Sequence, residues 1–240
     1  IPLDDERSWY RYHHFFANLL EQRLRTQQSD HVPELHHRAS QWLAKNGFKN
    51  EAVDHAFFAK DYVRAARLIE EIAEIEWDRA RESRLLQWFK KLPDEKIDAN
   101  PNLCIFYARE LFKSGYIDDA ETRLQAAEKS LESTTISDLN KEGLHGRIAV
   151  IRAYISTRMG NVSRIIHFAN QALTFLPKKD LMWRSVAATT LGFGYGWSGA
   201  GDLTTFSSKT KHPALASKSS RFWEAVVRWP GWYAKSWAGL

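Results

Sequence analysis

The sequence predicts an all-α protein, built as a right-handed α-solenoid of helix hairpins and preceded by a short β-hairpin at the N-terminus. Two observations lead to this fold class. Apolar residues recur at helical spacing from residue 14 onward, whereas a segment rich in β-forming residues is confined to residues 8–13. Three glycines, Gly115, Gly160 and Gly199, interrupt the helical pattern at intervals of 45 and 39 residues, which indicates a repeating unit.

The clearest unit occupies residues 102–132 and predicts two amphipathic helices joined at Ser114-Gly115-Tyr116. One apolar stripe runs along each arm: Cys104, Ala108, Leu111 and Phe112 on the first, and Ile117, Ala120, Leu124 and Ala127 on the second. Gly115 suits the left-handed backbone that ends a helix. Asp118 and Asp119 favour the start of the second arm, and Asp119 is expected to pair with Arg123 four residues later.

The segments around the three glycines match parts of the tetratricopeptide pattern, in which small residues recur where helices approach closely. The matching residues are Ala120, Leu124 and Ala127 in the first unit, Ala153, Ala169, Ala172 and Pro177 in the second, and Leu191, Gly192 and Tyr195 in the third. We therefore expect tetratricopeptide-like repeats over residues 96–206.

Shorter helices are predicted before the repeats. The period changes from strand-like to helical at His14, so a helix follows the β-hairpin within residues 1–30. Residues 31–95 predict a helical linker, in which one helix begins near Val32-Pro33 and stops at Asn46-Gly47. Further helices are expected at residues 50–59, 62–73 and 77–91.

The net charge of +5 comes entirely from the C-terminal tail. Six of the 34 basic residues and one of the 29 acidic residues lie after Phe206, so residues 1–206 carry 28 of each. Residues 207–240 contain four tryptophans and show no sustained period; they are interpreted as an unpatterned basic tail, translated from a shifted reading frame or, alternatively, binding a membrane surface or a partner. Because no basic face runs along a helix, direct nucleic-acid binding is not expected.

No catalytic constellation is found. The sequence has no G-x-S-x-G nucleophile elbow and no G-x-x-x-x-G-K-[ST] phosphate loop. The adjacent histidines His13-His14 and His36-His37 point about 100° apart on a helix and make poor joint metal ligands. The single cysteine, Cys104, excludes an intrachain disulfide and favours a cytoplasmic location. No run is long and apolar enough to span a membrane. We expect neither an enzyme nor a metal site.

Four stretches resemble the MalT-like, LuxR-type ATP-dependent transcriptional regulators of the STAND class. DERSWYRYHHFFANLLEQRL, residues 5–24, is similar to the signature that ends the winged-helix segment of that family. NGFKNEAVDHAFFAKDYVRAARLIE, residues 46–70, resembles the helical linker that follows it. LLQWFKKLP and PNLCIFYARELFKSGYIDDAETRL, within residues 85–124, resemble the start of the repeat domain.

The resemblance implies an effector-sensing, protein-interaction segment that relays binding to an ATPase module and a DNA-binding module, neither of which has its motif in this chain. ATP is then expected only for the upstream module, and no cofactor here. A small-molecule inducer or a protein or peptide is the expected partner, and self-association is left open. A free-standing tetratricopeptide scaffold and a non-functional fragment of such a regulator remain the alternatives.

In tetratricopeptide arrays the first helix of each pair lines a concave groove. Transferring those positions through the glycine alignment selects Asn102, Arg109, Lys113, Arg147, Tyr154, Arg158, Phe193 and Trp197. Cations beside aromatic rings suit an anionic peptide, nucleotide or sugar. The alternative is a solvated face with aromatic rings packed between repeats. If the groove binds, charge reversal at Arg109 and Arg158 is expected to weaken binding without lowering thermal stability.

Overall fold

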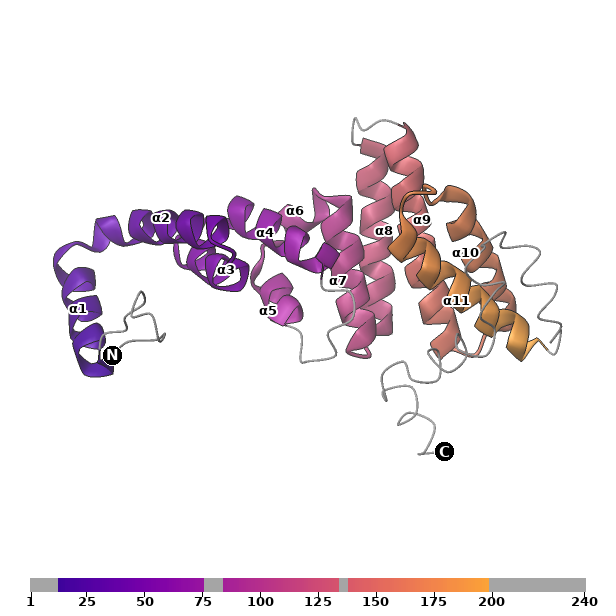
Figure 1. The fold of residues 1–240 in the computed structure, drawn as a ribbon, viewed down its shortest axis with the longest axis horizontal. Coiled ribbons are helices and arrows are strands. Elements are labelled where there is room, and N and C mark those ends of the chain that lie inside the picture. The colour runs from indigo at the N-terminus through magenta and orange to yellow at the C-terminus, as the bar shows by residue number, and fades with distance from the viewer. Residues whose placement is uncertain (1–12, 76–83, 134–137, 199–240) are drawn as a thin grey trace. The chain divides into compact units, whose positions relative to one another are not determined.

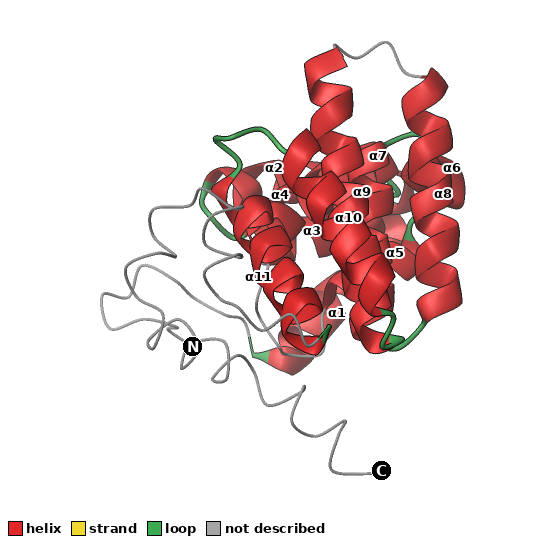
Figure 2. Ribbon diagram, turned by 90° about the vertical axis from the view of Figure 1, so that its right-hand side faces the viewer, coloured by secondary structure: helices red, strands yellow, loops and turns green. Residues whose placement is uncertain are grey.

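A computed structural model describes residues 13–75, 84–133 and 138–198, and every regular element within these ranges is a helix (Figure 2). The all-α class is thereby confirmed for the described part of the chain, which contains no strand. The predicted β-hairpin, whose β-forming segment ends at His13, lies outside the described residues except for His13, and the tail at 207–240 lies outside them entirely.

The chain divides into two compact units, Ile1–Glu76 and Trp77–Leu240. The boundary falls inside the range that the sequence predicted to be a helical linker. The first unit contains α1 (His14–Gln27), the short 3-10 helix η1 (Ser29–His31), α2 (Val32–Lys45), α3 (Lys49–Phe58) and α4 (Tyr62–Ile75). Here α2 packs on α3, and α3 packs on α4.

Local sequence explains the ends of the helices in the first unit. Pro33 lies in the first turn of α2, where its missing N–H costs nothing. Gly47 takes a φ of +88° just after α2, in the left-handed region that ends helices. Ser40 Oγ donates to the carbonyl of Ala52 on α3 at 2.8 Å and accepts from Arg64 Nε on α4 at 2.8 Å, which ties the three helices together.

The second unit contains α5 (Arg84–Lys91), α6 (Asp94–Asp98), α7 (Pro101–Lys113), α8 (Ile117–Ser133), α9 (Asp138–Arg158), α10 (Val162–Phe175) and α11 (Leu181–Trp197). Short turns join α7 to α8 and α9 to α10, so each pair forms an antiparallel hairpin (Figure 1). Helix α9 also contacts α7, α8 and α11, and α10 contacts α11. The two hairpins and α11 therefore share one packed core.

Both described hinges lie where the sequence predicted them. Gly115 and Gly160 have φ values of +89° and +65°, a backbone conformation that glycine adopts without strain. Gly199, the third predicted hinge, lies outside the described residues. Two asparagines cap the helices: the side chain of Asn100 accepts from the Asn102 amide at the start of α7, and Asn161 accepts from the Arg164 amide at the start of α10.

Two other glycines permit close helix packing. A Cβ on Gly146 of α9 would lie 2.8 Å from a side-chain carbon of Leu176, and a Cβ on Gly194 of α11 would lie 2.8 Å from Cγ1 of Ile166 on α10. Both distances are shorter than carbon atoms tolerate. The close approach of α10 to its neighbours thus depends on the absence of side chains at these positions.

One predicted ion pair is wrong. The sequence placed Asp119 four residues before Arg123 on α8, but the Arg123 guanidinium bonds the carboxylates of Asp94 and Asp98 on α6. It also lies over the ring of Tyr107 on α7, 5.0 Å from the ring centroid. Tertiary packing offers Arg123 two carboxylates and an aromatic face, which together outcompete one exposed neighbour on its own helix.

Candidate functional site

The eight predicted groove residues lie on α7, α9 and α11. Helix α9 contacts both α7 and α11. They form three levels, which we number from the start of α7 to its end. Level one holds Asn102 and Arg147, level two holds Arg109, Tyr154 and Phe193, and level three holds Lys113, Arg158 and Trp197. Residues of one level are equivalent under the 45- and 39-residue spacing.

The residues of level one form polar contacts between helices. Arg147 Nη1 donates to Asn102 Oδ1 at 3.4 Å, and Nη2 donates to Asp180 Oδ2 at 3.2 Å. The guanidinium also lies 4.9 Å from the ring centroid of Trp183 on α11. Arg147 therefore joins α7, α9 and the start of α11. The sequence analysis selected Asn102 and Arg147 as equivalent groove positions without predicting their contact, and it did not single out Asp180 or Trp183.

Level two is buried at Arg109 and partly buried at Tyr154 and Phe193. The side chain of Arg109 is 4% exposed; its Nε donates to Glu110 Oε1 at 3.0 Å, and its guanidinium lies 5.2 Å from the Phe106 ring centroid. Tyr154 stacks on Phe112 of α7 with centroids 6.0 Å apart. Tyr154 thus packs against the neighbouring helix α7, and Arg109 does not face solvent.

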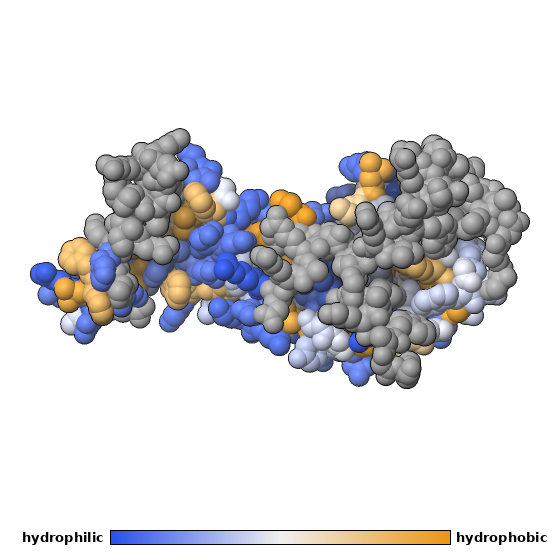
Figure 3. Space-filling view, turned by 60° about the horizontal axis from the view of Figure 1, so that its bottom comes forward, coloured by the Kyte–Doolittle hydropathy of each residue, from blue (hydrophilic) through white to orange (hydrophobic). Residues whose placement is uncertain are grey.

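Level three reaches the surface. Lys113 Nζ bonds both carboxylate oxygens of Glu110 at 3.4 Å and stays partly exposed. Arg158 is exposed, and Trp197 is 42% exposed with its ring 6.3 Å from that of Phe193. The described surface shows apolar patches among hydrophilic ones (Figure 3).

The hinge turns add apolar groups at the same ends of α7 and α9. Tyr116 is 49% exposed and Met159 is 60% exposed. The ammonium of Lys90 lies 5.3 Å from the Tyr116 ring centroid. Level three and the adjoining hinges thus present cations and large apolar side chains together, which is the chemistry that the sequence predicted for the whole groove.

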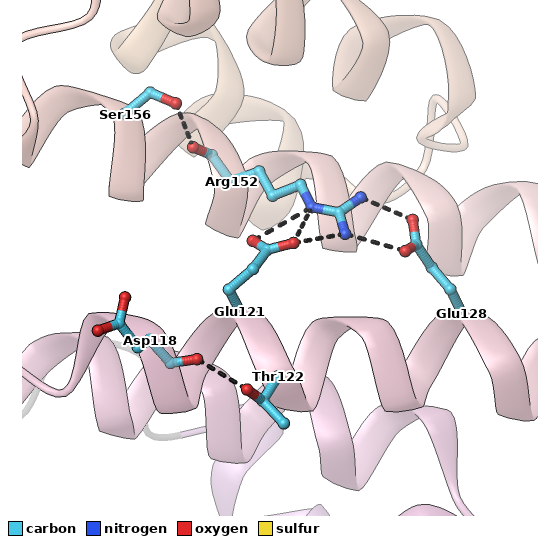
Figure 4. A network of polar contacts seen from close by, with 6 residues as sticks. All are labelled: Asp118, Glu121, Thr122, Glu128, Arg152 and Ser156. Atoms are coloured by element: carbon cyan, nitrogen blue, oxygen red, sulfur yellow. Dashed lines mark hydrogen bonds and ion pairs between the residues drawn. The ribbon is translucent and has the colours of Figure 1, made fainter.

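A second charged cluster joins α8 to α9, and sequence reasoning missed it. Arg152 of α9 donates to Glu121 from Nε and Nη2 at 3.0 and 2.7 Å, and to Glu128 from Nη1 and Nη2 at 2.6 and 2.9 Å (Figure 4). Burial by itself would lower the pKa of Arg152. The hydrogen bonds and charges of the two carboxylates have the larger effect, so the pKa lies above its ordinary value. The seven-residue spacing of Glu121 and Glu128 on one helix face was the available signal.

The Arg123 cluster has the same character. Burial lowers the pKa of Arg123, but the hydrogen bond and charge of Asp94 and the charge of Asp98 outweigh it and raise that pKa. Burial also raises the pKa of Tyr107, which lies beneath the guanidinium. Both arginines stay charged and hold helices in register, so these clusters are structural ties rather than proton-transfer groups.

Cys104 is buried on α7, as the sequence predicted, and its Sγ donates to the carbonyl of Ile97 at 3.2 Å. Burial raises the pKa of its thiol to about 12. The described ranges contain no group of three or more His, Cys, Asp or Glu arranged to hold a metal ion. None of the described helices is both long and apolar enough to cross a bilayer.

The comparisons with known proteins identify the class of protein that this chain resembles. The model of the MalT winged helix domain matches residues 1–32, which include the opening motif at residues 5–24. Only α1, η1 and the first residue of α2 in that range are described. No solved structure matches the chain significantly.

Two kinds of relative extend the similarity beyond that segment. The HTH-type transcriptional regulator MalT of Cronobacter sakazakii is 28% identical over 229 residues, covering 94% of this chain and 24% of the relative. The serine/threonine-protein kinase PknK of Mycobacterium tuberculosis and that of Mycobacterium bovis are each 34% identical over 178 residues, covering 71% of this chain and 15% of the relative. The chain thus spans about a quarter or less of these proteins, and its resemblance to MalT-like, LuxR-type regulators is confirmed.

Proposed function

We propose that this chain is the effector-sensing and protein-interaction segment of a MalT-like transcriptional regulator. In this proposal residues 96–206 form a tetratricopeptide-like, right-handed α-solenoid, and ligand occupancy is relayed to ATPase and DNA-binding modules outside the 240 residues. The segment itself is neither an enzyme nor a DNA-binding domain, requires no cofactor and works in the cytoplasm.

One observation carries the proposal: the first helices of successive hairpins lie next to one another. Helix α9 contacts both α7 and α11, and the equivalent residues Asn102 and Arg147 meet at 3.4 Å. Such an arrangement brings equivalent positions of successive repeats onto one continuous face. That face is the surface with which repeat arrays bind partners.

The structure narrows the part of that face that is suited to binding. Levels one and two are occupied by contacts within the protein, because Arg147 bonds Asp180 and Arg109 is buried against Glu110. Level three keeps exposed Arg158 and Trp197, and Tyr116 and Met159 adjoin it. A ligand with anionic groups and an apolar or ring-shaped portion suits these side chains.

The test is a two-step binding measurement on the whole chain. A thermal-shift panel of nucleotides, sugar phosphates and acidic peptides identifies a ligand, and titration calorimetry then compares Arg158→Glu and Trp197→Ala with wild type. We expect at least a tenfold loss of affinity, about 1.4 kcal/mol, in each variant. Arg164→Glu, on the second helix of the same hairpin, serves as the matched charge control. Equal affinity in all four proteins contradicts a binding site at level three.

A further inference from the structure

A histidine pair joins α2 to α3 in the first unit, away from the predicted groove. His36 Nδ1 lies 3.0 Å from His55 Nδ1, and the two ring centroids are 5.0 Å apart. The ring of Phe58 lies 5.0 Å from that of His36 and 6.3 Å from that of His55. Both imidazoles are half-buried. The contact therefore depends on which of the two facing nitrogens carries a proton.

The proton count of this contact is limited by its geometry. A hydrogen bond between two ring nitrogens needs one donor and one acceptor, so the two facing nitrogens together hold one proton. When both imidazoles are cationic, two N–H donors and two positive charges face each other at a distance where neither is satisfied. In the unfolded chain each histidine takes up its proton independently, near the ordinary pKa of about 6.5.

The neighbouring contact between His37 and Asp61 does not simply cancel the cost of two cationic imidazoles that face each other. His37 Nδ1 lies 2.9 Å from Asp61 Oδ2, and its Nε2 lies 2.6 Å from Gln41 Nε2. The carboxylate requires a donor on Nδ1, and the Gln41 amide nitrogen requires an acceptor on Nε2. Neutral His37 satisfies both partners, whereas a second proton faces an amide N–H until the Gln41 side chain turns.

The charged groups nearest the pair along the packed helices are one arginine and two carboxylates. From α4, Arg64 donates to Ser40, one turn along α2 from His36. On α3, Glu51 precedes His55 by one turn and Asp54 adjoins it. Carboxylates ordinarily stay ionised down to about pH 4.5, and arginine does not titrate.

We propose that the His36–His55 pair is a proton-sensitive contact that loosens the packing of α2 on α3 as the pH falls from 7.5 to 5.5. The sign follows from linkage: at the lower pH the unfolded or separated helices bind more protons than the packed ones, so acid favours separation. The first unit then has a conformational response to pH that α7 and α8 lack, because these two helices contain no histidine.

The experiment is amide hydrogen exchange of the full chain at pH 7.5 and pH 5.5, with each rate corrected for the intrinsic dependence on pH. Protection of α2 and α3 is expected to fall about tenfold at pH 5.5, while protection of α7 and α8 stays constant as an internal reference. Equal protection of α2 and α3 at both pH values in the wild-type chain overturns the proposal, whatever the variants do.

Two variants assign the effect to the pair. His55→Gln supplies an amide that can donate to or accept from His36, so the loss of protection at pH 5.5 should shrink to less than threefold. His37→Gln removes the contact with Asp61 but keeps the pair, and the loss should remain. If His55→Gln is unprotected already at pH 7.5, His36→Gln replaces it. A tenfold loss of amide protection at pH 5.5 that persists in folded His55→Gln, or in His36→Gln where it replaces that variant, contradicts the proposal.

Discussion

Charged side chains in the interior of the second unit serve packing before they serve binding. Arg109 and Glu110 are both nearly fully buried and lie next to each other on α7, with Lys113 completing the pair at the surface. Charges in such a place must be paired and hydrogen-bonded to be tolerated. The sequence expectation that charge reversal at Arg109 leaves stability unchanged therefore does not fit the structure.

Replacing Arg109 by glutamate tests this environment. Arg109→Glu puts two carboxylates side by side in a buried position, and the free energy of unfolding is expected to drop by about 3–5 kcal/mol. Arg158→Glu, at the exposed level three, is the matched control and should cost about 1 kcal/mol or less. Urea denaturation followed by circular dichroism measures both. Similar stabilities of the two variants would contradict the burial of Arg109.

The thiol of Cys104 provides a prediction about pH. Because burial raises its pKa from the ordinary 9.0 to about 12, the folded chain stays protonated where the unfolded chain loses its proton. The folded state thus binds more protons between pH 9 and 12, and this group's contribution to stability declines as the pH rises through that window. Cys104→Ala should reduce the fall in melting temperature between pH 8 and pH 10. Alkylation by iodoacetamide at pH 8.5 should be fast only in urea.

At the scale of elements, the clamp between α8 and α9 holds two hairpins in register. Arg152 forms ion pairs with Glu121 and Glu128, which lie two helical turns apart on α8 (Figure 4). It also lies 6.0 Å from the Phe168 ring centroid on α10. One guanidinium thereby touches the second helix of one hairpin and both helices of the next.

Removal of this clamp should weaken the contact between hairpins. Arg152→Gln keeps a polar side chain but loses the charge and the paired hydrogen bonds, and we expect a loss of about 1–3 kcal/mol in unfolding free energy. Glu121→Gln with Glu128→Gln in the Arg152→Gln background completes a double-mutant cycle, and its coupling energy should exceed about 1 kcal/mol. Purely additive effects would show that the pairs contribute little.

Two glycines of α11 make a matched test of helix packing. In Gly194→Ala the new Cβ lies 2.8 Å from Ile166, so the variant is expected to lose about 1–3 kcal/mol. In Gly196→Ala the new Cβ meets nothing within 4 Å, and the higher helix propensity of alanine should leave stability unchanged or raise it by up to about 1 kcal/mol. Thermal unfolding distinguishes them, and equal melting temperatures would contradict the close approach of α10 and α11.

At the scale of the whole molecule, the two compact units have separate cores. The core of the second unit is drawn from α5 to α11, with large buried side chains such as Phe89, Phe106 and Trp183. A shortened chain consisting of residues 77–240 is therefore expected to fold alone, with cooperative unfolding and protected amides in α7 and α9. Loss of that protection on removal of residues 1–76 would show that the second unit depends on the first.

Much of the helical layout could be predicted from local patterns. The hinges at Gly47, Gly115 and Gly160, and the start of α2 at Val32-Pro33, were all located, because each depends on backbone chemistry within a few residues. The predicted site could be derived from the sequence only in part. Repeat spacing identified equivalent residues but could not say whether Arg109 or Arg158 faces solvent, since the exposure of each side chain depends on the helices packed around it.

The sequence by itself determined most of the helices, the hinges at Gly47, Gly115 and Gly160 and the resemblance to MalT-like regulators, because helical periodicity, left-handed glycine and motif spacing are all properties of neighbouring residues. Only the tertiary structure decided that α5 and α6 pack on α7, that Arg123 bonds α6 rather than a residue of its own helix, and that Arg158 is exposed whereas Arg109 is buried. The physical reason is that burial and ion pairing depend on what surrounds a side chain, and α7 is surrounded by four other helices.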